Sequence, residues 1–191
     1  MKSYFPKPLV LAGAIAGLAL LPACSEADTA EPTDTATKEE PTLTLAAALG
    51  EVPDMASLNG AIANAELASI FEGPASYTVL APNDAAFTAL GDRGKVLMTE
   101  EQRPVLAGIL REHILPGHLT PESISQAIED KGGEVSMTTF GGNTVTFSKD
   151  GDTIVASNGS GGEAHLAAGA TAATNGVIIP IDTVLVPGEE G

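Results

Sequence analysis

The histidines of this chain are candidates for metal ligands. His113 and His118 lie five positions apart across Pro116-Gly117, so they cannot share one helix face as a zinc-binding i, i+4 pair would. Nothing near them supplies the other ligands that zinc requires. We therefore predict no metal site and expect a structural hydrogen bond for His113.

Three segments resemble catalytic or cofactor-binding motifs, but each lacks residues that the motif requires. Ser160 lies in NGSGG, where Asn158 takes the place of the first glycine of a nucleophile elbow. Gly94-Lys95 lacks the upstream glycine and the following Ser or Thr of a phosphate-binding loop. Asp150 and Asp152 offer too few of the roughly 6–8 oxygen ligands that calcium takes. We predict neither catalysis nor a cofactor.

The N-terminus has the three parts of an export signal. Lys2 and Lys7 precede an uncharged apolar run at residues 9–21, and the small residue Ala23 stands before Cys24, the only cysteine. As a helix this run would span only about 20 Å, against a hydrocarbon core of roughly 30 Å. We therefore predict that residues 1–23 form a signal peptide and not a permanent membrane helix.

Residues 21–24, Leu-Pro-Ala-Cys, resemble the lipobox of bacterial lipoproteins. In that family the cysteine is acylated and becomes the first residue after cleavage, and two or more acyl chains anchor a protein stably. The resemblance implies that Cys24 is a lipid anchor on an exported protein. Ser25 stands where some lipoproteins carry the Asp that retains them in the inner membrane, so the resemblance favours the outer membrane. The alternative is an ordinary export signal with an incidental cysteine.

Charge and composition divide the rest of the chain. The formal net charge is −16, from 25 acidic and 9 basic residues, so no basic surface is available for nucleic acid. Residues 25–41 are acidic and contain no large apolar side chain, which is typical of a disordered linker. We expect a signal peptide at 1–23, a lipidated cysteine and linker at 24–42, one domain at 43–187 and a tail at 188–191.

Helical periodicity dominates the first half of the domain. Ser57 is a suitable N-cap, and residues 99–102 fit a capping box in which Gln102 reaches back. Thr120-Pro121 begins a further helix, and Gly-containing pairs follow the last two helices as stop signals. We expect helices near residues 43–49, 57–70, 99–115 and 120–132.

The second half of the domain changes to the alternation of strands. Short runs rich in Val, Thr and Phe occupy residues 134–140, 144–148 and 153–157, and Asp150-Gly151 is a hairpin signal. Residues 177–186 form a long apolar run in which Pro180 indicates an edge strand or a bulge. Helices that precede strands favour an α+β fold.

Four segments resemble conserved stretches of the fasciclin domain, in the family's order. The first is YTVLAPNDAAFTAL at residues 77–90, in which an apolar strand is followed by Ala-Pro, a polar residue, Asp and a helix. In it Asn83 or Asp84 caps the helix and Phe87 locks it on the core. The other three are LREHILPGHLT at 110–120, TFGGNTVTF at 139–147 and NGVIIPIDTVLVP at 175–187.

The sequence departs from the family pattern at two positions. The family's Tyr-His is Glu112-His113 here, and a family histidine is replaced at Ile179.

This resemblance implies a single fasciclin-like domain that binds a surface polysaccharide or a protein in adhesion or matrix contact. The residues that we single out for interaction are Asn83, Asp84, Phe87 and His113, although helix capping and core packing also account for them. One alternative function is a carrier that holds a small apolar ligand in a pocket of the same domain. Another is a hydrolase, which would need a polar cluster that the sequence does not show.

Overall fold

The computed structural model describes residues 40–186. All the described residues belong to one compact unit. The predicted signal peptide, Cys24, most of the linker and the tail lie outside the described residues, so those assignments stay predictions. Because this unit contains the three hydrophobic clusters described below, it has a core of its own.

All the helices of the described chain precede β3, and only the strands β1 and β2 lie between them. The α-helices are α1 (Leu45–Glu51), α2 (Ala56–Asn64), α3 (Asp84–Ala89), α4 (Gly91–Leu97), α5 (Arg103–Glu112) and α6 (Pro121–Lys131). Two short 3-10 helices accompany them, η1 (Ala68–Glu72) and η2 (Glu100–Gln102).

Two four-stranded sheets form the β-structure of the domain. The strands are β1 (Tyr77–Pro82), β2 (Ile114–Pro116), β3 (Val135–Thr138), β4 (Thr144–Asp150), β5 (Thr153–Ser157), β6 (Glu163–His165), β7 (Thr171–Ala173) and β8 (Gly176–Ile181). The first sheet has the order β2-β1-β8-β7 and the second the order β3-β4-β5-β6. Strands β1 and β8 pair in parallel and the other neighbours are antiparallel. The predicted hairpin is present, since Asp150 pairs with Thr153 across Gly151 and Asp152.

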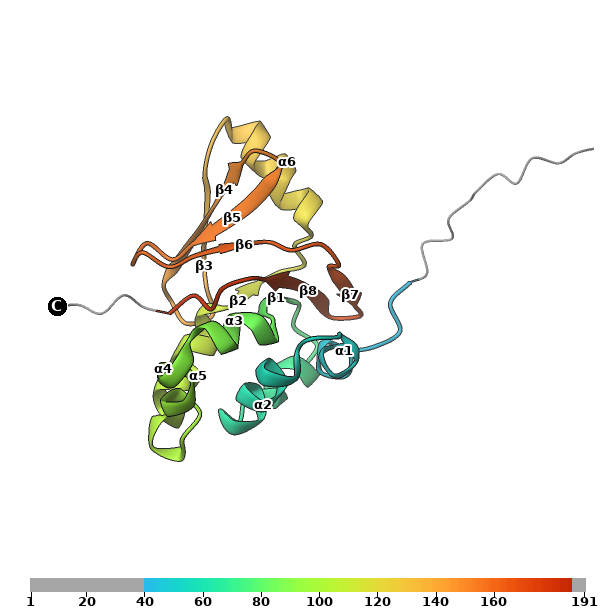
Figure 1. Ribbon diagram of the computed structural model, residues 1–191. Helices are drawn as coiled ribbons and strands as arrows, with labels where there is room; N and C mark the ends of the chain where they lie inside the picture. The colour runs from blue at the N-terminus through green and yellow to red at the C-terminus, as the bar shows by residue number, and fades with distance from the viewer. Residues whose placement is uncertain (1–39, 187–191) are drawn as a thin grey trace, which may run out of the picture. The chain divides into compact units, whose positions relative to one another are not determined.

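The two sheets are joined at both sides. The Phe140 N–H donates to the Ile114 carbonyl over 2.7 Å on one side, and Leu166 forms a bridge with Ile181 on the other. The core between the sheets is mostly aliphatic and includes Leu80, Ile179 and Phe147. Helix α6 packs on β3 and β4, away from α1 to α5, which lie together in Figure 1.

Strand alternation divides the side chains of β1 and β8 between two cores. Val79 and Ile178 are paired neighbours and belong to the cluster formed with α1, α2 and α5. The next pair, Leu80 and Ile179, belongs to the cluster between the sheets. Successive side chains of a strand point to opposite faces, so each strand is buried on both sides. The first sheet therefore lies between the helices and the second sheet.

Four predicted helix boundaries are wrong. The helix expected at 57–70 ends at Asn64, and a separate 3-10 helix, η1, follows it. Helix α2 begins at Ala56 without a side-chain cap from its own N-cap residue, so Ser57 is not the cap. Thr99 makes no cap bond either, and α5 begins at Arg103 after the turn η2. A proline in its first turn, where the N–H is not needed, accounts for that start. Helix α5 also ends at Glu112, because Ile114–Pro116 leave it to form β2.

Pro180 lies within a strand that is internal to its sheet, so neither an edge strand nor a bulge describes it. Strand β8 is paired with β1 along its whole length, but β7 pairs only as far as Ile178. The Pro180 carbonyl accepts from the Ala167 N–H over 2.8 Å, so the polar side of Pro180 faces the region beyond the end of β7. The missing N–H therefore breaks no ladder bond. The strand itself ends at Ile181, earlier than predicted.

Candidate functional site

Asn83 and Asp84, the first pair of predicted site residues, cap two different helices. Asn83 Oδ1 accepts from the Ala86 N–H over 2.8 Å and caps α3, the helix that follows it. Asp84 Oδ1 accepts from the Ser57 N–H over 2.7 Å and so caps α2, which lies 27 positions earlier in the chain. The Asp84 N–H donates to the Asp54 carbonyl over 2.8 Å. The junction after β1 therefore also fixes the beginning of α2.

The Asp84 carboxylate is stabilised in its charged form by these contacts. Hydrogen bonds from Ser57, the backbone N–H first, lower the pKa of Asp84 below its ordinary value. A carboxylate at the first turn of α2 is also favoured by the partial positive charge of a helix N-terminus.

Phe87 is half-buried on α3. It packs against the cluster beneath α1, α2 and α5 and also against the smaller cluster of α3, α4 and α5. The packing role expected for Phe87 is therefore present. Its role in recognition, like that of Asn83 and Asp84, stays a prediction.

His113 lies inside the domain, with only 1% of its surface exposed. Its Nε2 accepts from the Leu185 N–H over 2.9 Å, so the proton of the neutral ring is on Nδ1, which donates to the Ile109 carbonyl over 2.8 Å. Burial lowers the pKa of His113 to about 4. The expected structural hydrogen bond is present, and a buried ring offers no surface for contact with a partner.

Glu112, which replaces the family's tyrosine, holds the loop between β3 and β4. Its Oε2 accepts from the Thr139 hydroxyl over 2.5 Å and its Oε1 accepts from the Asn143 amide over 2.9 Å. A side chain on Gly141 would overlap this carboxylate. Sequence reasoning missed this role, although the polar residues on both sides of Phe140-Gly141-Gly142 were the available signal.

Asn175, at the start of the closing segment, is a second residue that sequence reasoning passed over. Its Oδ1 accepts from the Leu45 N–H over 2.7 Å, which ties it to the start of α1. Its amide donates to the carbonyls of Phe71 and Gly73 over 2.9 and 3.0 Å. A side chain on the next residue, Gly176, would overlap the Tyr77 carbonyl. The Asn-Gly pair therefore fastens β8 to three earlier segments.

The remaining polar residues of interest are not brought together in one place. His165 Nδ1 lies 3.0 Å from Asp182 Oδ2 in a half-exposed pair, and His118 is exposed. The Ser160 N–H donates to Asn158 Oδ1 over 3.1 Å within an exposed turn. Ile179 is fully buried between the sheets, so the position where the family has a histidine contributes packing.

Within residues 40–186, no group of three or more His, Cys, Asp and Glu side chains could hold a metal ion. The same residues include no helix that is both long enough and apolar enough to cross a membrane.

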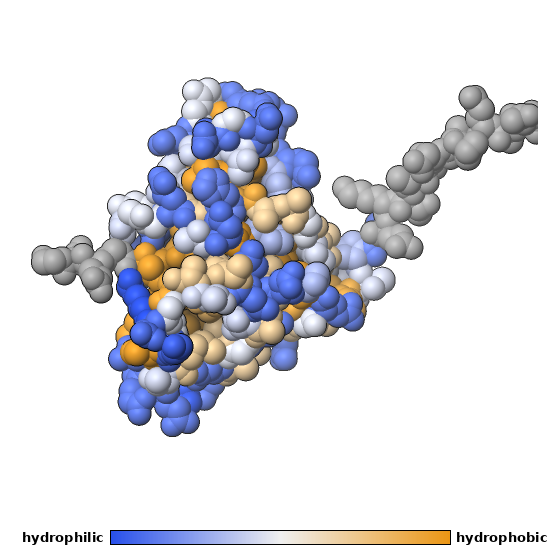
Figure 2. Space-filling model, in the orientation of Figure 1, coloured by the Kyte–Doolittle hydropathy of each residue, from blue (hydrophilic) through white to orange (hydrophobic). Residues whose placement is uncertain are grey.

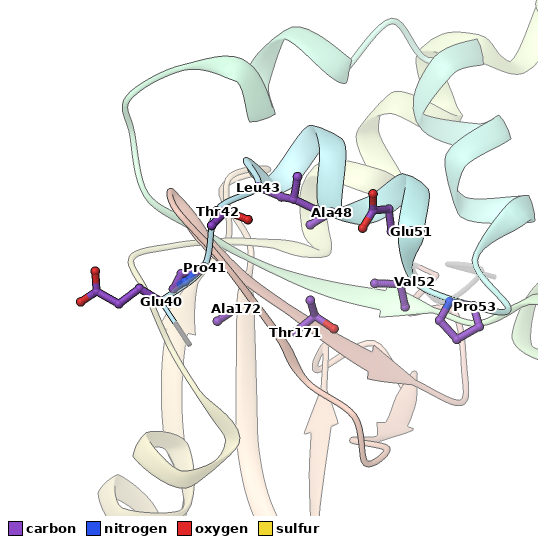
Figure 3. A pocket seen from close by; sticks show the side chains of 10 residues that line it. All are labelled: Glu40, Pro41, Thr42, Leu43, Ala48, Glu51, Val52, Pro53, Thr171 and Ala172. Carbon is purple, nitrogen blue, oxygen red and sulfur yellow. The ribbon is translucent and has the colours of Figure 1, made fainter. Parts of the chain in front are cut away.

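Several clefts open on the helical side of the described domain, and two of them are larger than the rest of those found there. One, of about 390 Å³, lies between the segment that leads into α1, α1 itself and β7, and Glu40 points away from it (Figure 3). The other, of about 690 Å³, is lined by the start of α2, by α3 and α4 and by Met98. The larger cleft lies beside the Asn83–Asp84 junction, since Ser57 and Phe87 are among its walls.

The order of elements and the strand-to-helix junction at Asn83–Asp84 define a small α+β domain of the fasciclin class. Residues 53–187 match the Fasciclin domain family, and the chain belongs to that family. Fasciclin domains are associated with cell adhesion and are generally non-catalytic binding modules. The fasciclin resemblance and the α+β fold expected from the sequence are confirmed.

Two relatives give the extent of this similarity. The chain is 33% identical over 134 residues to Protein sll1483 of Synechocystis sp., covering 69% of this chain and 66% of that protein. The solved structure of a FAS1 domain pair from the insect cell adhesion molecule fasciclin I has a TM-score of 0.67 at 17% identity. The match covers 76% of this chain and 51% of the solved chain, so this chain spans only part of each relative's length.

Proposed function

We propose that this chain is a lipid-anchored, extracytoplasmic binding module that acts in cell adhesion or in contact with a surface matrix. Membership of the fasciclin family supports the binding role. The lipobox-like residues before Cys24 support the anchor, and the acidic segment after it supports a tether. The partner is a surface polysaccharide or a protein, and nucleic acid is disfavoured by the net charge of −16.

The observation that carries this proposal is that the polar side chains of the motif residues form hydrogen bonds within the domain. Asn83, Asp84 and His113 each bind backbone groups of the domain itself, and Glu112 binds a neighbouring loop. Such side chains maintain a rigid scaffold and are not arranged around a reacting atom. Recognition then falls to the outer surface of that scaffold.

Large apolar side chains on this surface are the first places to look for the contact. Val96 on α4, Val105 on α5 and Phe140 after β3 are 54%, 51% and 43% exposed. Figure 2 shows hydrophobic side chains reaching the surface at the lower left of the view, near α4. Exposed apolar and aromatic side chains commonly supply the buried centre of an interface.

The test is binding of soluble residues 25–191 to intact cells and to extracted surface polysaccharide from the same source. We expect saturable binding that persists at moderate salt, because the contact is mainly apolar and not ionic. Phe140→Ser should weaken it, whereas Thr153→Ser, at an exposed strand position, should not. Binding no greater than that of a charge-matched unrelated protein would overturn the adhesion proposal.

A further inference from the structure

The cleft between α2 and the α3–α4 pair has the size of a small-molecule site. Its volume is about 690 Å³, within the roughly 300–1,000 Å³ range of ligand pockets in proteins. Two of the helices that form its walls, α2 and α3, are tied together because Asp84 at the start of α3 caps α2. The cleft is therefore formed by the scaffold itself.

Apolar groups and missing side chains make up most of this cleft. Phe87 and Met98 supply an aromatic ring and a thioether, and a methionine side chain adapts readily to the shape of an apolar ligand. Gly91 and Gly94 line the α4 side. Gly91 has a φ of +59°, and a side chain there would meet only open space. The absence of that side chain enlarges the opening.

One charged side chain, Lys95, is among the residues that line the cleft. Its ammonium pairs with Asp92 over 2.8 Å, but the two side chains are 80% and 94% exposed, and such a pair is weak and easily exchanged. The carboxylate of Asp84, which lies nearby, is already bound by the Ser57 N–H. Because the chain has a net charge of −16, most of its surface repels anions. Lys95 therefore gives this cleft a local positive charge that an anionic ligand could contact.

Hydroxyl groups complete the polar side. Ser57 and Thr88 both line the cleft, and Thr88 Oγ1 donates to the Asp84 carbonyl over 2.8 Å. A hydroxyl that donates in one direction still accepts in another. The cleft therefore offers an apolar floor, two hydroxyls and one ammonium.

We infer that this cleft binds a single-chain amphiphile with one anionic head group, such as a long-chain carboxylate, whose chain lies on Phe87 and Met98 and whose head group meets Lys95. This binding is independent of the adhesion proposal, because it uses a cleft and not the exposed Phe140. It gives the domain a small-ligand site in addition to a surface contact.

The experiment titrates soluble residues 25–191 with dodecanoate and, separately, with dodecanol, both below the concentrations at which they aggregate, and follows the heat of binding. We expect saturable binding of dodecanoate. Lys95→Gln should weaken dodecanoate binding about 5-fold, the effect of losing one exposed ionic contact, and should leave dodecanol binding unchanged. Thr88→Phe, which fills the cleft, should abolish binding of both.

Lys131→Gln is the matched control, because it removes the same charge from the last turn of α6, where Lys131 is exposed. It should bind both probes as the unmodified protein does. Equal weakening by Lys95→Gln and Lys131→Gln would mean a general charge effect and would overturn the site. The site would also be overturned if the unmodified protein, with a normal circular dichroism spectrum, showed no saturable binding of dodecanoate. Neither result would affect the adhesion test.

Discussion

His113 lies where the end of α5 meets the C-terminal segment after β8. The imidazole joins the Ile109 carbonyl to the Leu185 N–H, residues far apart in the chain. The bond from the Leu185 N–H requires the neutral ring, because Nε2 can accept only when it carries no proton, whereas Nδ1 donates to the Ile109 carbonyl in either state. The residue is therefore a structural link that depends on its protonation state.

We predict that this link makes the domain less stable in acid. The pKa of His113 is lowered from 6.5 to about 4 in the folded protein, so between these values the unfolded chain binds a proton that the folded domain does not. Stability is therefore full above about pH 6.5 and is lost as the pH falls towards 4. The loss from this group amounts to about 3 kcal/mol.

Urea unfolding at pH 7, 5.5 and 4.5 measures this loss. His113→Gln should be less stable at pH 7 and should lose less stability on acidification than the unmodified protein. A constant stability difference at all three pH values would contradict the prediction. The imidazole signal of His113, followed by NMR in the unmodified protein, should not titrate above about pH 5, and that measurement does not depend on whether the variant folds.

At the scale of elements, the junction after β1 organises two helices at once. Asn83 caps α3, while Asp84 turns to the first turn of α2. The sequence pattern Pro-Asn-Asp predicts one cap, and the structure supplies two. Helix α2, which lacks a side-chain cap from its own N-cap residue, depends on this distant carboxylate.

Asp84→Ala is therefore expected to lower the unfolding temperature by several degrees and to increase amide exchange in the first turn of α2. Loss of a helix cap leaves backbone N–H groups without their partner. Asp84→Asn, which keeps an acceptor oxygen, should have a smaller effect. Because the pKa of Asp84 is lowered, its stabilising effect is present above its ordinary pKa and is lost as the pH falls through the lowered value.

Asp152→Ala serves as the control for this experiment, since it removes a carboxylate from the exposed turn between β4 and β5. It should leave exchange in α2 unchanged. Equal amide exchange in the first turn of α2 for Asp84→Ala and Asp152→Ala would show that α2 does not need the cap that Asp84 provides.

At the scale of the whole molecule, we expect that Cys24 decides where the domain is held. Cys24→Ser should release the protein from the membrane fraction and abolish incorporation of labelled palmitate, because the acyl chains would have no thiol to attach to. The folded domain should be unaffected, since its core lies within residues 43–186. A variant that is still labelled would contradict acylation at this cysteine.

The fold could be predicted largely from local patterns. Helical spacing, the short Val- and Thr-rich runs and the Asp150-Gly151 turn all act over a few residues, and the corresponding elements are present. The boundaries at Ser57 and Ile114 were wrong because contacts from elsewhere in the chain determine them. The boundary at Thr99 was wrong for a local reason, since the proline in the first turn of α5 sets the start of that helix. Ile114 illustrates the cause, since helical spacing includes it but pairing with Val79 places it in β2.

The sequence by itself determined the class of the domain, its aliphatic core and its acidic charge, because these follow from composition, periodicity and motifs read along the chain. Only the tertiary structure decided that Asp84 caps α2, that Glu112 holds the β3–β4 loop and that Asn175 fastens β8 to α1. It also decided that an apolar cleft with a lysine at its mouth lies beside the first motif. Each of these joins residues distant in sequence, and such pairs are set by the packing of elements that local pattern does not specify.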